Sequence, residues 1–268
     1  TVKCSYSPQI AGSSTNAEIG TGLNKGANPA NVIYDLLTNY LGVATGDIDT
    51  ASFTTVRTSL AGATAPLGVN LVVDKPTDVK KVINNVCGFA DLILDKRRNS
   101  SGDYKWFLVE LKATDSAGAG VYPLGDQFDA SNTKKAQLEF NGWETVYTDL
   151  TMEYTNQALG KKAGFKFTNE NARLLLGGTK EKKIDYGIKV FGTDTIKAIL
   201  SREASKLTRP LAMLSFTYYD SPAYSSDINV GDVIEYKNPQ YGISSYMSFR
   251  VLSVSGLKED NFERSLTA

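Results

Sequence analysis

The sequence predicts an α+β fold in which a helix-rich mixed α/β domain is followed by a mostly antiparallel β-rich domain that contains one helix. Apolar residues recur at helical spacing in three segments of the first half. β-branched and aromatic residues dominate the second half, as is typical of strands. A stretch at 113–133 has few periodic apolar residues and marks a boundary or a long loop. The expected ranges are an irregular N-terminal segment at 1–27, the mixed domain at 28–130 and the β-rich domain at 131–268.

Three helices are expected in the first half. The first begins at Asn28, which can cap it before a proline in the first turn, and it ends at Gly42. The second spans 50–60 and buries one apolar face. The third opens at Asp78 and stops at Gly88, with a cysteine on its apolar side.

Strands and hairpins are expected between and after these helices. Alternating residues predict a strand at 69–73, and residues 90–113 predict a hairpin that turns near residues 101 and 102. One later helix, which Asp194 can cap, interrupts a series of strands. The expected strands of the second half are 138–140, 145–154, 164–167, 184–192, 211–219, 232–237 and 247–254.

Composition excludes several classes of protein. The chain contains no histidine, which excludes Ser-His-Asp and Cys-His catalysis and His-ligated zinc. Its 29 Lys and Arg balance its 29 Asp and Glu, so no overall positive field attracts nucleic acid. Cys4 and Cys87 are far apart in sequence and are expected to be reduced thiols. No apolar run is long enough for a membrane span, and no signal-peptide pattern is present. Because the first residue is Thr, we expect a piece of a longer chain.

One group of residues in the expected hairpin resembles a catalytic site. Asp91 is expected in one strand, and Glu110 and Lys112 in the other, as in the Asp…Glu-x-Lys core of metal-dependent nucleases. That chemistry needs two carboxylates to hold a divalent cation and a lysine on the same strand face to activate water. A turn at residues 101 and 102 would place Asp91 opposite Lys112 as an ion pair. A turn one residue earlier would place it opposite Glu110, a repulsion that a metal would relieve.

The ion pair is the favoured interpretation. Glycine at the second turn position favours the first of these two registers. Acid-x-base spacing also recurs elsewhere, as at Asp78/Lys80 and Glu235/Lys237, so it is not specific. A metal-dependent nuclease-like domain that uses Asp91, Glu110 and Lys112 is therefore the alternative function, and the primary prediction includes no catalytic, cofactor-binding or metal-binding residue.

Five segments form an ordered set of motifs. Residues 28–53 contain Asn-Pro-Ala-x-Val-x-x-Asp-Leu-Leu-Thr-Asn, then a Gly-containing loop and an Ile-Asp…Phe helix. A Gly-Asp-Val-Ile strand at 231–234 leads into a hairpin that returns as Arg-Val at 250–251. The other segments are 68–88, 143–157 and 171–219. Together, these motifs resemble the central tail hub, or tail-tip, proteins of long-tailed bacteriophages.

The resemblance implies a structural virion protein of the tail tip or baseplate, without enzymatic activity or a cofactor. Such hubs are homotrimeric rings whose β-barrel tube domains line a channel, so the range 131–268 is expected to be the tube-type domain. The implied partners are the distal tail protein, the tape-measure protein and receptor-binding proteins, with DNA only in transient passage. No direct membrane insertion is expected, and assembly would take place in the bacterial cytoplasm. Complete hubs are usually longer than this chain.

Overall fold

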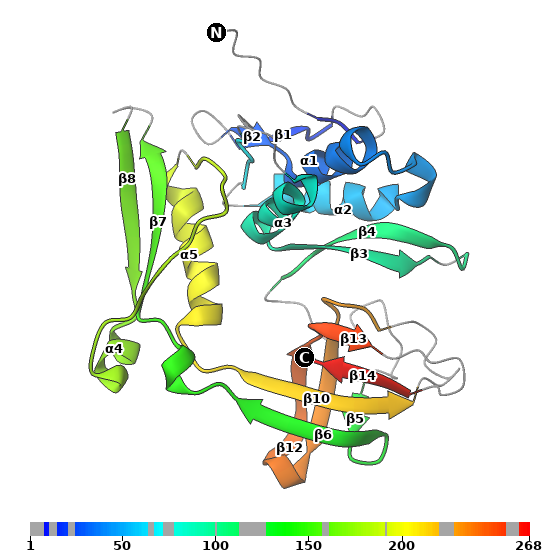
Figure 1. Cartoon of the computed structure of the whole chain (residues 1–268), viewed down its shortest axis with the longest axis vertical. Coiled ribbons are helices and arrows are strands. Elements are labelled where there is room, and N and C mark those ends of the chain that lie inside the picture. The colour runs from blue at the N-terminus through cyan, green and yellow to red at the C-terminus, as the bar shows by residue number, and fades with distance from the viewer. Residues whose placement is uncertain are drawn as a thin grey trace, which may run out of the picture. The chain divides into compact units, whose positions relative to one another are not determined.

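The computed structural model describes residues 8–10, 15–20, 25–63, 67–71, 78–99, 101–112, 127–156, 161–190, 192–219, 228–255 and 263–268 (Figure 1). These residues confirm an α+β fold in which most strand pairs are antiparallel. Contacts within the chain divide it into two compact units, each built from two segments. Unit 1 comprises Thr1–Glu110 and Trp143–Arg209, and unit 2 comprises Leu111–Gly142 and Pro210–Ala268.

The three helices of the first half begin where the sequence predicts. They are α1 (Pro29–Asp35), α2 (Thr50–Ala61) and α3 (Val79–Ala90), and α1 continues into a π-helical turn at Leu36–Tyr40. The side chains of Asn28, Asp49 and Asp78 each accept a hydrogen bond from a backbone N–H of the first turn. These bonds satisfy donors that a helix start leaves unpaired.

The prediction that Gly88 ends the third helix is wrong. The helix runs on to Ala90, and Asp91 ends it in the left-handed region with φ 55°. Asp91 is therefore a helix-terminating residue rather than a member of a strand. A glycine inside a helix does not by itself end it, because its lack of a side chain lowers helix propensity without blocking any hydrogen bond.

The hairpin after α3 is present, whereas the strand expected at 69–73 is not seen as a ladder. β3 (Leu92–Arg98) pairs in antiparallel fashion with β4 (Tyr104–Glu110). Val69 forms one isolated bridge with Ala27, and residues 72 and 73 lie outside the described residues. Ala27 belongs to the short pair of β1 (Glu18–Ile19) and β2 (Gly26–Ala27).

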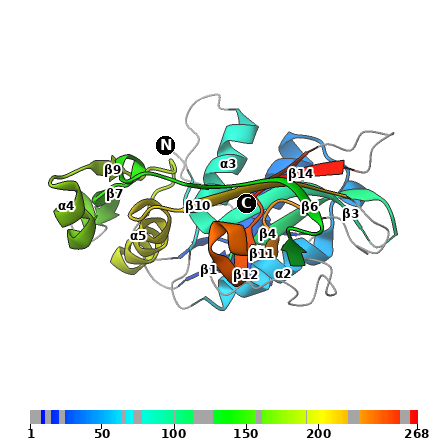
Figure 2. The same cartoon turned by 90° about the horizontal axis from the view of Figure 1, so that it is seen from below.

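A second sheet of unit 1 has the strand order β8-β7-β9. Its strands are β7 (Asp149–Asn156), β8 (Lys161–Thr168) and β9 (Glu181–Lys183). The long helix α5 (Thr193–Leu207) packs along β7 and β8 (Figure 1, Figure 2). It buries Ile196, Ile199 and Leu200 in a core shared with Leu150 and Met152 of β7.

Three predictions for this region are wrong. The second half contains a further helix, α4 (Glu170–Leu176), because Asn169 caps its start and Gly177 ends it with φ 65°. Residues 184–190 form no strand, although Ile184 and Ile188 are buried. Their neighbourhood makes single backbone bonds, such as that from the Lys189 N–H to the Asn70 carbonyl, instead of a ladder. Asp194 lies in the first turn of α5, whose N-cap position is Gly192.

Unit 2 consists mainly of two sheets, with the orders β13-β14-β10-β6 and β12-β11-β5. The first contains β6 (Thr133–Phe140), β10 (Ala212–Tyr219), β13 (Ser253–Ser255) and β14 (Glu263–Thr267). The second contains β5 (Gln127–Asp129), β11 (Val233–Asn238) and β12 (Ile243–Arg250). An aromatic core fills this unit. The ring centroid of Phe216 lies 4.9 Å from that of Phe128 and 5.6 Å from that of Tyr236. The described strands of unit 2 form separate sheets and do not close into one barrel.

Each unit combines segments from both halves of the chain. Strands and helices after residue 130, β7 and α5 among them, share the core of unit 1 with α1 to α3. Whether the ranges 1–27, 28–130 and 131–268 are separate domains stays a prediction. Among the described residues, no helix has the length and apolar character needed to span a membrane.

Candidate functional site

Asp91 is held by cations from α5. Its Oδ1 lies 2.6 Å from Lys206 Nζ, and its Oδ2 lies 3.8 Å from Arg202 Nε. Its backbone N–H donates to the carbonyl of Cys87, which closes the last turn of α3. The side chain is only 18% exposed, so these contacts lie near the core. Asp91 therefore joins the end of α3 to α5.

Arg202 is the centre of this contact. Its Nη1 donates to the carbonyl of Phe89 at 3.0 Å, and its Nη2 donates to the carbonyl of Gly88 at 2.9 Å. The same guanidinium donates to Glu203 Oε1 from Nε at 3.0 Å. The last carbonyls of a helix have no partner within the helix and carry partial negative charge, so a cation at this place stabilises α3. We define Asp91, Arg202, Glu203 and Lys206 as the α3–α5 clamp.

Both registers predicted for the hairpin are wrong. Leu92 lies opposite Glu110, and Arg98 opposite Tyr104, which is midway between the two predicted alignments. The cause is the turn after Arg98, in which the Asn99 side chain accepts backbone hydrogen bonds from Ser101 and Asp103. A side chain that bonds the backbone in this way sets a loop length that turn statistics for two-residue hairpins do not describe.

The three residues of the nuclease-like group therefore do not lie together on two paired strands, as the sequence suggested. Glu110 is the last residue of β4, as the sequence predicts, but Asp91 precedes β3 and pairs with α5. Lys112 follows the end of β4 and lies in unit 2, where its carbonyl accepts from Arg250 Nη2 at 2.7 Å. Within the described residues, no group of three acidic, Cys or His side chains is arranged to hold a metal ion. The geometry around Asp91 is that of an ion-pair clamp.

Cys87 is poorly suited to nucleophilic chemistry. Burial raises the pKa of its thiol to about 12, so almost no thiolate is present at neutral pH. Cys4, the other cysteine of the chain, lies outside the described residues. Among the described residues, Cys87 is a free cysteine.

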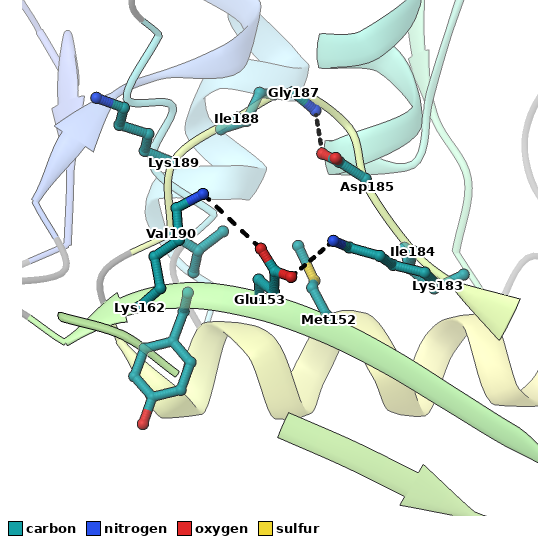
Figure 3. Close-up of a pocket in the computed structure, with 11 residues that line it drawn as sticks. Met152, Glu153, Lys162, Lys183, Ile184, Asp185, Gly187, Ile188, Lys189 and Val190 are labelled. Carbon is teal, nitrogen blue, oxygen red and sulfur yellow. Dashed lines mark hydrogen bonds and ion pairs between the residues drawn. The ribbon is translucent and has the colours of Figure 1, made fainter. Parts of the chain in front are cut away.

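A small pocket of about 190 Å³ lies between β7 and the chain that follows β9 (Figure 3). Glu153 stands in it between two lysines, 2.7 Å from Lys183 Nζ and 3.9 Å from Lys162 Nζ. The hydrogen bond and charge of Lys183 hold the pKa of Glu153 below its usual range, and the same contact raises the pKa of Lys183. A carboxylate with a lowered pKa is a poor general base at neutral pH, so this group is better suited to holding β9 beside β7.

An exposed apolar surface on α4 was missed in the sequence analysis. Leu174 is 81% exposed and Leu175 is 67% exposed, while Ala172 is the buried residue of this helix. The helix is held in place by its cap, since Asn169 Nδ2 donates to Thr208 Oγ1 and to the Thr208 carbonyl, both at 3.1 Å. The run of three leucines before two glycines could have indicated a short helix with an unburied apolar end.

The fold was compared with those of known proteins. No protein-family model matches the sequence, and no curated protein matches it. A chain from the virion of a native gene transfer agent particle matches 89% of this chain and 46% of its own length, with a TM-score of 0.58 and 9% identity. A tail protein from Neisseria meningitidis MC58 matches 75% of this chain and 57% of its own, with a TM-score of 0.48 and 10% identity. The 43 kDa tail protein of prophage MuSo2 from Shewanella oneidensis matches 93% and 66%, with a TM-score of 0.49 and 12% identity.

The second and third of these structures are tail proteins, the third of them from a prophage. At 9% identity, the match to the gene transfer agent chain shows a shared fold, and it extends over nearly the whole of the present chain. The chain spans between 46% and 66% of the length of the three structures compared above.

Proposed function

We propose that this protein is a structural component of a phage tail or a tail-like particle, and that it acts as the central hub at the tail tip. The observation that carries the proposal is the fold shared with a chain of the gene transfer agent virion over 89% of this chain. The motifs that resemble tail hubs support it independently, because they were recognised from the sequence alone. The hub would form a homotrimeric ring around the tail channel and belong to the virion.

The clamp and the Glu153 ion pairs support a role in architecture. Both groups join secondary-structure elements that are far apart in the chain, α3 to α5 and β7 to β9. Function would then depend on shape and on contacts with the distal tail, tape-measure and receptor-binding proteins, with DNA passing through the channel. In this proposal the protein has no enzymatic activity.

The two exposed leucines of α4 supply a contact surface for such an assembly. Exposed neighbouring apolar side chains are typical of interaction sites, and a rigid, capped helix presents them without a large ordering cost. Burial of one leucine contributes about 1.5–3 kcal/mol, so two leucines would contribute about 3 kcal/mol or more to a subunit contact. We propose that Leu174 and Leu175 contact a second copy of this chain in the ring.

The proposal is tested by the size of the purified protein in light scattering and by its shape in electron micrographs. A trimer with threefold rings is the expected result, and a monodisperse monomer at high concentration would contradict the hub assignment. The variant Leu174→Ser/Leu175→Ser should weaken association by about 100-fold, which corresponds to about 3 kcal/mol, with little change in unfolding temperature. Leu252→Ser, at a leucine 58% exposed in unit 2, is the matched control. Equal association of both variants would show that α4 is not a subunit contact.

A further inference from the structure

Six neighbouring positions on one face of the β13-β14-β10-β6 sheet, spread over three adjacent strands, carry hydroxyl groups. Strand register places these residues in two straight rows that run across the sheet. The opposite face of the same strands carries buried side chains such as Phe216 and Leu266, which belong to the core of unit 2. The two rows are Ser253, Thr267 and Ser215, and then Ser255, Ser265 and Thr217. We refer to these six residues as the hydroxyl face.

Composition does not account for the hydroxyl face. Ser and Thr make up 46 of the 268 residues, yet they occupy all six of these positions. Ser253, Ser255 and Ser265 are exposed, and the other three members are partly exposed. The side chains of Thr217 and Ser265 also bond each other across the strands, with their oxygens 3.4 Å apart. The face is thus a solvent-accessible surface of small polar side chains.

Charged residues border this face. Along β14, the next residue on the same side of the sheet is Glu263, which lies opposite Tyr219 of β10. At β6 the two rows continue into Gln137 and Lys134, and the next pair along β10 is Met213 with Glu139. The polar face of the β8-β7-β9 sheet in unit 1 is different, because it carries the ion pairs of Glu153 and of Asp149 with Lys166. The hydroxyl face is therefore distinguished from another solvated sheet face of the same chain by its lack of charge.

This chemistry suits a surface along which a polyanion moves. Binding of DNA depends on cations that neutralise phosphates and release counterions, and the six positions contain none. They also contain no carboxylate that would repel the phosphates. Stable protein contacts need aromatic or large apolar anchors, and these are missing from the six positions as well. A row of hydroxyls exchanges hydrogen bonds readily with water, so it gives neither a binding site nor a barrier.

We infer that the hydroxyl face lines the channel of the assembled ring and that duplex DNA passes along it. The inference rests on the proposed function, because it requires a ring with a channel. It adds to that function a specific sheet face and a physical reason why DNA is not retained there.

The position of the face is tested by the accessibility of Ser265→Cys in assembled rings, in a Cys4→Ser background. Cys87 is not expected to react, since its thiol is buried. Biotin-maleimide is small enough to enter a channel that admits DNA, whereas streptavidin is wider than a duplex. The expected result is full biotinylation in the ring with loss of most streptavidin capture, which returns when the ring is dissociated. Ser131→Cys and Ser245→Cys, both at exposed residues of unit 2, control for the activity of the reagents.

Each other outcome contradicts the inference in a distinguishable way. Streptavidin capture that is undiminished in intact rings would place Ser265 on the outer surface. Failure of biotin-maleimide to react would place it in a subunit contact. Both results leave the hub proposal standing, because rings have formed. Absence of rings under every condition would remove the proposed function, and the inference with it.

The role of neutrality is tested by adding charge. Unmodified rings should not retain duplex DNA at physiological salt, and retention there would contradict the inference. Rings of the variant S215K/S255K/S265K should retain it, with a slope of log K against log salt that steepens by about 0.9 for each new phosphate contact. The matched control, S244K/S245K/S248K, adds the same charge at exposed positions of β12. Equal retention by the two variants would show that net charge, and not its place on the hydroxyl face, controls DNA binding.

Discussion

Replacement of Arg202 by methionine should destabilise unit 1 more than any change of an exposed charge. The guanidinium is 19% exposed and donates to the carbonyls of Gly88 and Phe89 as well as to Glu203. Methionine keeps much of the side-chain volume but removes all of these bonds. Hydrogen bonds to charged groups contribute about 1.5–3 kcal/mol each, and water can replace part of that at a side chain near the surface. Glu203 would also lose its closest cation while remaining buried.

The expected loss is about 3 kcal/mol of unfolding free energy, or about 6–12 °C in unfolding temperature for a unit of this size. Urea and thermal unfolding followed by circular dichroism measure both quantities. Lys197→Met is the matched control on the same helix, because Lys197 is 59% exposed and lies 3.8 Å from Asp194. It should cost about 0.5 kcal/mol. If Arg202→Met and Lys197→Met had equal effects, the clamp would not stabilise the end of α3, and the reasoning would be refuted.

Three further predictions concern the same unit. Gly88→Ala should cost about 1–3 kcal/mol, because an added Cβ would lie 2.9 Å from Tyr186 Cε1, and a double-mutant cycle with Tyr186→Leu should recover much of that loss. The Cys87 thiol should resist Ellman's reagent until the protein unfolds. Burial raises the pKa of this thiol from 9.0 to about 12, so the free energy of unfolding should fall as the pH rises through that interval. Urea titrations at several pH values would detect the fall. Burial acts to raise the pKa of Asp149, but hydrogen bonds from Thr168, Lys166 and Thr148 lower it on balance below 3.8. Its contribution should therefore be present above pH 3.8 and be lost at lower pH, so Asp149→Asn should unfold at neutral pH more easily than the parent and show a weaker acid dependence.

Local signals in the sequence were sufficient for the helices of the first half. Asn28 and Asp78 are capping residues beside clear apolar stripes, and the structure uses both as caps. The buried face of α2, with Phe53 and Leu60, follows directly from helical spacing. These elements are determined by residues within a few positions of one another.

Features that depend on distant contacts were not predictable in the same way. Asp91 was expected in a strand because it precedes an apolar run, but its backbone and side chain are fixed by α3 and by cations more than 100 positions later in the chain. The alternation in 184–192 correctly indicated buried Ile184 and Ile188, yet burial alone cannot distinguish a strand from an irregular segment. Periodicity reports which side chains are buried, and it does not report which backbone groups are available to pair.

The geometry of the candidate site also depends on contacts between distant residues, so the sequence did not predict it. Residue types around the hairpin suggested a nuclease-like group, but Asp91 ends α3 and pairs with α5, and Lys112 lies beyond the end of β4. The hydroxyl face could not be recognised from the sequence, because its six residues come from three strands whose order in the sheet is not their order in the chain.

The path of the chain between the units has a consequence for how the protein is made. The chain crosses from one unit to the other after Glu110, after Gly142 and after Arg209. Unit 1 therefore lacks α5, and with it Ile196, Ile199 and Leu200, until the chain has been synthesised past residue 207. Unit 2 in turn waits for β14 and for Ala268, which directly follows that strand and exchanges two backbone hydrogen bonds with Leu214. Neither unit can complete its fold before these later segments are synthesised, and an expression fragment cut at residue 130 would expose the unfinished cores of both.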